Sequence, residues 1–155
     1  MDITIPTALK SLSMAGSASK ALAAWRKKST GDARSLIDEI GNNLRYLDLV
    51  IDDDIDLAKV VKDISVKEFD RLSKEGYNFN ALKRKKIPKM PSLDGTDLES
   101  WQEKGTQDLV DSIYDKLKDI LIKYPHTKSN PEYRWKIRAR NIRKRIWLLV
   151  KHINS

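Results

Sequence analysis

The sequence contains no cysteine and no long apolar run, and each absence excludes a class of protein. Without cysteine there is no disulfide framework, no thiolate metal site and no cysteine nucleophile. No segment reaches the roughly 18 consecutive apolar residues of a membrane-spanning helix, so we expect no integral membrane association. Asp2, Lys10 and Lys20 interrupt the N-terminal segment, which therefore does not have the pattern of a signal peptide. We expect a cytoplasmic protein.

The motifs of several common enzyme classes are also missing. The sequence has no glycine-rich phosphate loop, no GxSxG and no HExxH. His126 has no second ligand near it in sequence, and the acids between Asp52 and Asp56 lack the spacing of a calcium loop. We therefore expect no cofactor and no metal ion.

The residues that are present predict an all-α protein. The chain has 155 residues, of which 40% are hydrophobic and 34% charged, which is enough for one domain with its own core. Apolar residues recur at steps of three and four, and no useful length of alternating strand pattern occurs. We predict a single helical bundle over residues 1–155, with four principal helices plus short helices.

Capping residues, prolines and apolar stripes place these four helices. The second helix, at 32–51, and the third, which begins after a capping box at Thr96 and ends at Pro125, have clear stripes. The third helix is interrupted near Gly105 or continuous through it. The first helix is expected at 7–27, with a face of small residues, and the last at 131–152. The predicted core positions of the four helices, in order, are Ala8, Leu12, Ala15, Ser19 and Leu22; Ile37, Ile40, Leu44, Leu47 and Ile51; Val110, Ile113, Leu117, Ile120 and Tyr124; and Trp135, Ala139, Ile142, Ile146, Leu149 and Ile153.

The segment between the second and third helices is predicted to be less regular. A short helical segment is expected near residues 56–63, and a capping box at Ser65 opens another that ends near Lys74, before Gly76. Residues 77–95 are predicted to be a long irregular loop, which is often a functional feature in a compact domain. This loop carries the basic run Lys83, Arg84, Lys85 and Lys86.

Most of the net charge of +8 lies on the last predicted helix. Residues 131–155 contain eight basic residues and one acid, whereas residues 32–75 contain twelve acids and seven basic residues. The basic side chains are either exposed to an anionic partner or neutralised by the acidic segment, within one chain or between two copies. As partner-binding candidates we take the basic run of the loop together with Arg134, Arg138, Arg140, Arg143 and Lys144.

One pair on the last helix suggests a catalytic alternative. Arg145 and His152 are seven residues apart and share a helical face, where His would move a proton and Arg would stabilise a phosphorane-like charge. Here the chain resembles the HEPN family of helical-bundle ribonucleases, which carry Arg, four to six residues, then His on a late helix. The resemblance implies a site shared across a dimer. The chain departs from it at Ile146, where the family usually has a polar residue. We expect both side chains at the exposed flank of the bundle.

Three functions therefore remain in view. The first is a non-enzymatic interaction module that presents its basic C-terminal helix to a protein or other anionic partner, including a second copy of itself. The second is a HEPN-like ribonuclease, and the third is a nucleic-acid-binding regulator whose affinity falls steeply with salt.

Overall fold

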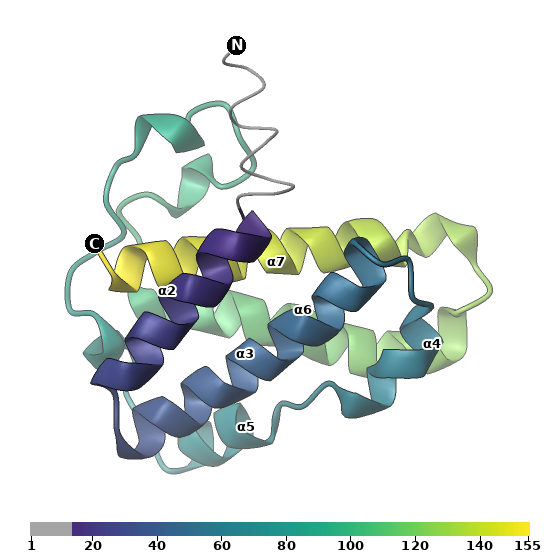
Figure 1. The fold of residues 1–155 in the computed structure, drawn as a ribbon, viewed down its shortest axis with the longest axis horizontal. Helices are drawn as coiled ribbons and strands as arrows, with labels where there is room; N and C mark the ends of the chain where they lie inside the picture. Colours follow the sequence, from purple (N-terminus) through teal and green to yellow (C-terminus); the bar gives the residue numbers. More distant parts are fainter. Residues whose placement is uncertain (1–13) are drawn as a thin grey trace.

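The computed structural model describes residues 14–155, and every regular element among them is a helix. The long helices are α2 (Met14–Lys28), α3 (Gly31–Ile51), α6 (Thr106–Thr127) and α7 (Trp135–Ile153). The short elements are α4 (Leu57–Val60) and α5 (Lys67–Lys74), with the 3-10 turns η2 (Val61–Asp63), η3 (Phe79–Leu82), η4 (Pro91–Leu93), η5 (Glu99–Trp101) and η6 (Pro131–Tyr133). The predicted all-α helical bundle with four principal helices is confirmed (Figure 1).

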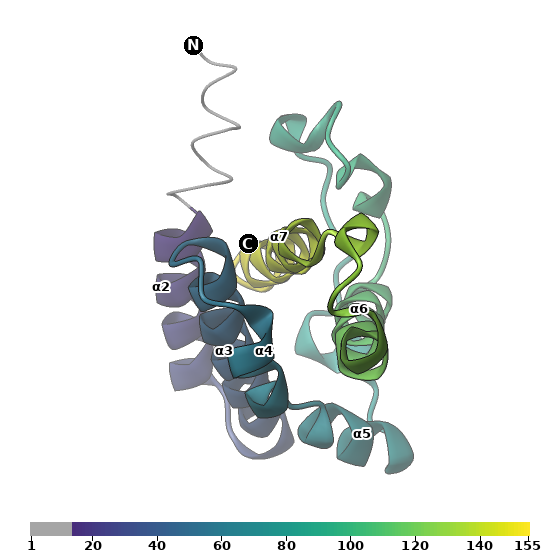
Figure 2. The same ribbon diagram turned by 90° about the vertical axis from the view of Figure 1, so that its right-hand side faces the viewer.

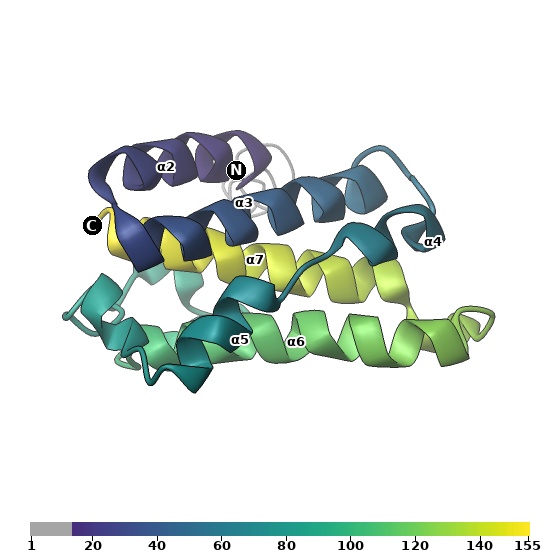
Figure 3. The same cartoon turned by 90° about the horizontal axis from the view of Figure 1, so that it is seen from below.

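Helix α7 is the central helix of the described part. It contacts α2, α3 and α6, and in Figures 2 and 3 it lies between the α2–α3 pair and α6. This position explains why α7 is apolar over so much of its circumference. Ile142, Ile146 and Leu149 of its predicted stripe are buried, and so are Trp147 and Leu148 beside the stripe. The predicted core residues of α3 and α6 are buried as well.

Two polar residues of α3 hold the segment that leads into α5. The Glu39 carboxylate, 6% exposed, accepts hydrogen bonds from the backbone N–H groups of Glu68 and Phe69 and from the Tyr114 hydroxyl. The fully buried Asn43 exchanges two hydrogen bonds with the backbone of Ser65. A carboxylate at the positive end of a helix satisfies free N–H groups there. Glu39 and Asn43 therefore belong to the core.

The structure corrects three predicted details. Ser19 is exposed, because α2 buries Ala18, Leu22 and Trp25 instead; Ala8, Leu12 and Ala15 lie outside the residues whose side chains the structure describes. Pro125 does not end α6. It lies in the last turn, where the Thr127 hydroxyl donates to the Lys123 carbonyl.

The third correction concerns the start of the last helix. Asn130 caps the short turn η6, as its sequence suggests, but α7 itself begins only at Trp135. Arg134 separates the two elements with a left-handed backbone, φ +45°. A non-glycine residue in this region has a strained backbone. No side chain caps the N-terminus of α7.

Residues 75–105 contain only short 3-10 turns and are fixed to the end of α7 by polar contacts. Gly76 follows α5 with φ +77°, a left-handed conformation that favours glycine at a helix end. The Lys83 ammonium donates to the carbonyls of Ile153 and Ser155 at the end of α7. Within the segment itself, the Ile87 N–H donates to the Lys104 carbonyl. In Figure 1 the part of this segment that holds η4 and η5 stands above the C-terminal end of α7.

Candidate functional site

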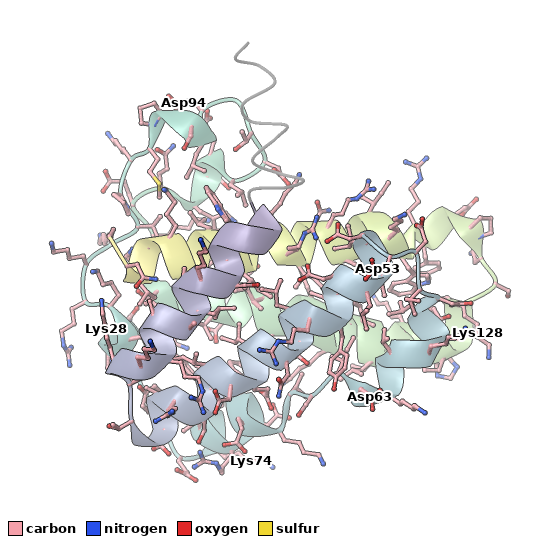
Figure 4. The ribbon with its side chains drawn as sticks, viewed as in Figure 1. Lys28, Asp53, Asp63, Lys74, Asp94 and Lys128 are labelled. Atoms are coloured by element: carbon pink, nitrogen blue, oxygen red, sulfur yellow. The ribbon has the colours of Figure 1, made fainter. Side chains whose placement is uncertain are left out.

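The basic residues of α7 divide according to the helix that they face. Arg143 is 3% exposed and donates from Nη1 to Asp48, at 3.0 Å, and to Asp52, at 2.8 Å. Both acids belong to the end of α3, which overlies the first half of α7 (Figure 4, near Asp53). Burial raises the pKa of Asp48 even though Arg143 opposes that shift. Our interpretation of Arg143 as a partner-binding residue is therefore wrong, because the acidic segment already neutralises it inside the protein.

Two lysines of α7 are also paired within the chain. Lys136 forms an ion pair with Asp54, and this hydrogen bond lowers the pKa of the exposed Asp54 carboxyl. Lys144 is partly buried and lies 3.5 Å from Asp97. Part of the basic charge of α7 is thus paired with acidic residues of the same chain.

On the opposite side of α7, a groove of about 330 Å³ runs between α6 and α7. Its walls combine cations, aromatic rings and aliphatic side chains, with two acids among them: Lys116, Asp119, Ile120, Glu132, Tyr133, Arg134, Trp135, Ile137, Arg138, Asn141 and Ile142. Ile137 is 43% exposed and contributes apolar surface to the groove. The groove therefore offers both a charged and an apolar contact surface.

Lys116, Arg134 and Arg138 are the cations that line this groove, and Arg145 lies beside it, with its Nη1 bonded to the carbonyl of the lining residue Asn141. We call Lys116, Arg138 and Arg145 the cationic cluster. None of the three forms an ion pair with a carboxylate within residues 14–155. Burial first, and then the charges of Arg145 and Arg138, lower the pKa of Lys116, while Asp119 and Asp115 oppose the shift. Like charges without an ion-paired carboxylate favour binding of an anion.

Arg145 is incompletely satisfied by the protein. Its Nη1 donates to the backbone carbonyl of Asn141, one turn earlier on α7, while its Nε is buried without an acceptor. Burial lowers the pKa of Arg145, although Asp97 opposes this shift. A guanidinium carries five N–H donors, so Arg145 retains unused hydrogen-bonding capacity.

The aromatic residues of the groove pack against one another. Tyr133 and Trp135 stack with centroids 5.4 Å apart, and Tyr124 meets Trp135 edge to face. The Arg138 guanidinium lies over both rings, at 5.2 Å from Tyr133 and 5.3 Å from Trp135. No free aromatic platform for a nucleic-acid base is therefore evident around Trp135. Trp147, which stands beside the arginines in sequence, is 4% exposed.

Acidic side chains accompany the groove on the α6 side. Asp108, Asp111, Asp115 and Asp119 recur at steps of three and four, which places them on one face of α6. Asp119 lines the groove itself and lies 3.7 Å from Lys123. The groove thus combines a basic wall from α7, one lysine from α6 and an acidic border.

The basic run of the loop lies apart from this groove. Arg84, Lys85 and Lys86 are exposed and form no ion pair among the described residues. Lys83 instead places its ammonium on the last carbonyls of α7, where a cation offsets the negative end of the helix dipole. Lys83 is therefore better explained as a helix cap than as a partner-binding residue.

Arg145 and His152 do not share an accessible surface. His152 is 0% exposed, contrary to our expectation of an exposed flank, because the segment around Lys83 covers the end of α7. Its Nε2 lies 2.9 Å from the Thr106 hydroxyl, which donates to the Lys83 carbonyl. Nε2 is then the protonated nitrogen that donates to Thr106. Burial, followed by the charge of Lys83, lowers the pKa of His152.

Sequence reasoning did not identify Lys116, Tyr133 and the exposed Ile137 as parts of one site. Lys116 flanks the predicted core residue Leu117, and only the packing of α6 against α7 shows that it lies near Arg138 and Arg145. No group of three or more His, Asp and Glu within residues 14–155 is arranged to hold a metal ion. No helix of this part is long and apolar enough to cross a membrane.

Comparison of the chain with protein-family models, with curated proteins and with solved structures gives no match.

Proposed function

We propose that this chain is a non-enzymatic interaction module that binds a segment of a protein partner in the groove between α6 and α7. The observation that carries the proposal is the groove itself, whose walls include Lys116 and Arg138, neither of which forms an ion pair with a carboxylate within residues 14–155. Arg143 and Lys136 pair with acids on the α3 side of α7, whereas Lys116 and Arg138 on the α6 side form no ion pair within residues 14–155, which favours an anion from outside.

The mixed character of the groove favours a protein over a nucleic acid. A nucleic-acid strand carries a negative charge at every nucleotide, and the row of aspartates on α6 repels an extended polyanion. A protein segment is able to place an anionic side chain at the cluster and apolar or basic side chains beside Ile137 and Asp119. The ribonuclease alternative receives no support from the buried position of His152.

Selection from a displayed library of random peptides tests this function. We expect the wild-type protein to select peptides that contain acids, and the variant Lys116→Glu/Arg138→Glu to lose them by about tenfold or more in affinity. The control is Lys27→Glu/Lys28→Glu, which changes the net charge equally at exposed positions of α2. In Figure 4 Lys28 lies at the opposite end of the molecule from Lys128, which follows α6.

Two results would contradict the proposal. One is the absence of any selected peptide whose binding depends on Lys116 and Arg138. The other is tight binding of a short RNA, with a steep loss in salt, that the groove variant and the α2 variant weaken equally.

A further inference from the structure

We infer that the buried imidazole of His152 is a pH-sensitive switch, which holds residues 83–104 against the end of α7 while it is neutral and releases them when it is protonated. We call residues 83–104 the covering segment. The inference concerns a different part of the molecule from the groove between α6 and α7, and it does not depend on what that groove binds.

The switch is a chain of hydrogen bonds that begins at His152. Its Nε2–H donates to the Thr106 hydroxyl at 2.9 Å, and Thr106, the first residue of α6, donates in turn to the Lys83 carbonyl at 2.8 Å. The Lys83 ammonium returns to α7, where it donates to the carbonyls of Ile153 and Ser155. His152 and Thr106 are both 0% exposed. These contacts join the covering segment to both long helices, and one imidazole takes part in them.

The neutral ring fits this arrangement and the protonated ring does not. Because Thr106 uses its hydrogen on the Lys83 carbonyl, Nε2 carries the proton of the neutral imidazole, and a second proton has to enter at Nδ1. Nδ1 is buried and forms no hydrogen bond within residues 14–155. A proton there creates a buried cation with an unpaired N–H group, which costs more free energy in the closed state than in an open, hydrated one.

The groups around the ring also disfavour a cation. Burial lowers the pKa of His152, and the ammonium of Lys83 on the covering segment lowers it further, while the backbone carbonyl of Lys85 opposes the shift only in part. From α6 the ring meets the uncharged Thr106 hydroxyl. On α7 the adjacent Lys151 is exposed. Within residues 14–155, no carboxylate of α2, α6 or the covering segment is among the groups that act on this pKa.

Release of the covering segment uncovers an apolar part of α7. Pro88 and Met90 of the covering segment form one wall of a second groove, of about 460 Å³, which Trp147 and Val150 of α7 also line. Val150 is 1% exposed in the closed state. The covering segment contains only 3-10 turns, and in Figure 1 its turns η4 and η5 project from the four long helices. Its local opening therefore exposes Val150 while the long helices remain folded.

Protonation shifts an equilibrium and does not open the protein completely, because the buried Ile87, Leu93 and Leu98 also hold the covering segment. Above the usual pKa of 6.5, both states contain a neutral ring, and as the pH falls below that value the open state binds the proton first. The ratio of open to closed molecules therefore rises in mild acid, by up to about tenfold for each pKa unit that separates the two states.

The test uses single-cysteine variants of the whole chain, which has no cysteine of its own. Val150→Cys places a thiol beneath the covering segment, and Ala139→Cys places one in the core of the same helix, where Ala139 is 0% exposed. Labelling by a disulfide reagent that is active in mild acid measures how often each thiol is uncovered. The exposed Lys28→Cys corrects for the pH dependence of the thiol itself.

The labelling rate of Val150→Cys, relative to Lys28→Cys, should rise about threefold or more between about pH 7 and about pH 5. The relative rate of Ala139→Cys should stay constant, because that thiol is uncovered only when the bundle unfolds. His152→Gln keeps an N–H donor for Thr106 but does not titrate, so the rise should be absent when it is combined with Val150→Cys. The NMR titration of the His152 ring in the wild type should have its midpoint below 6.5, within the same pH interval as the rise.

Three results would overturn the inference. The first is an equal rise for Ala139→Cys, which would show that acid unfolds the whole bundle. The second is a labelling rate of Val150→Cys that does not change while the His152 ring titrates. The third is a rise that persists with His152→Gln. If that variant does not fold, a midpoint of the ring titration outside the pH interval of the rise contradicts the switch just as directly.

Discussion

Arg143 and Arg145 lie two residues apart on α7 and have opposite environments. Arg143 faces α3, where it is 3% exposed and contacts two aspartates. Arg145 is near Lys116 of α6, and its only hydrogen bond within the described residues goes to a backbone carbonyl of its own helix. Two positions along a helix turn a side chain by about 200°, so the same residue type meets two different neighbours.

This difference shows which basic residues of α7 stabilise the fold. The charge facing α3 is paired with acids of the chain itself, and removing it should destabilise the fold. The charge facing α6 forms no ion pair with a carboxylate within residues 14–155, and removing it should leave the fold intact while changing what the groove binds. Each prediction below tests one side of this comparison.

The largest effect is expected for Arg143→Ala. The substitution leaves Asp48 and Asp52 close together and partly buried without a counter-charge. Breaking a buried ion pair on one side costs about 3–5 kcal/mol, and the partial exposure of both aspartates places our expectation near the lower end. Urea unfolding followed by circular dichroism measures it. Arg145→Ala, measured in parallel, should cost less, and an equal or larger cost for Arg145→Ala would invalidate the comparison.

The next largest effect concerns His152, whose burial the sequence did not predict. His152→Ala should lower the free energy of unfolding by about 2 kcal/mol, because it creates a cavity and removes the bond to Thr106. A loss within the roughly 0.5 kcal/mol typical of surface sites would show that the end of α7 is open. His126→Ala, at an exposed position, serves as the control.

The same histidine should make stability depend on pH. Because burial and the charge of Lys83 lower the pKa of folded His152 below its usual 6.5, the unfolded chain binds a proton first as the pH falls. The His152 contribution is present above pH 6.5 and is lost between that value and the lower folded pKa. The urea midpoint of the wild type should fall over this interval, with a flatter slope in His152→Gln. A wild-type slope in His152→Gln would show that His152 does not cause this pH dependence. His126→Gln, the control, should keep the wild-type slope.

Local sequence signals sufficed for the long helices because each buried stripe is continuous. Ile37 to Ile51 and Val110 to Tyr124 follow the helical repeat without interruption, so their burial could be predicted position by position. The small residues of α2 do not define one face by size alone, and the predicted face wrongly includes the exposed Ser19. Pro125 predicts a helix end too early, because a proline in the last turn disrupts few hydrogen bonds.

The site could be predicted only in part, because it depends on contacts between distant segments. The basic character of α7 is visible in the sequence, but the pairing of Arg143 with Asp48 and the approach of Lys116 to Arg145 follow from packing. The sequence predicts an exposed His152 because the residues that cover it, Lys83 and Thr106, are remote in sequence. The positions of charged residues in the sequence do not show which of them lie close together in the fold.

A smaller effect on stability, combined with a large effect on binding, is expected for Arg138→Glu. The substitution removes the contacts with Tyr133 and Trp135 at an exposed position, which should cost about 1 kcal/mol or less. Binding of the selected peptides should nevertheless be lost. Arg140→Glu is the matched control, since Arg140 is exposed but does not line the groove. Unfolding of Arg138→Glu, or equal loss of binding in both variants, would contradict the assignment of the groove.

The smallest effect is a gain in stability for Lys116→Met. Lys116 is partly buried and has no ion-pair partner within the described residues, so the substitution removes a desolvated charge and its repulsion by Arg145 and Arg138, offset in part by the lost attraction to Asp119 and Asp115, while it keeps an apolar stem. Because water screens a partly exposed lysine, the gain should be only a few tenths of a kcal/mol. Lys118→Met on the same helix should have the opposite sign, because Lys118 contacts Asp70 at 2.7 Å and lies over the Phe69 ring. The difference between the two variants in thermal unfolding is therefore more informative than either value alone. If Lys116→Met is the more destabilising of the two, Lys116 supports the fold, and the cationic cluster is no longer a set of charges held for a ligand.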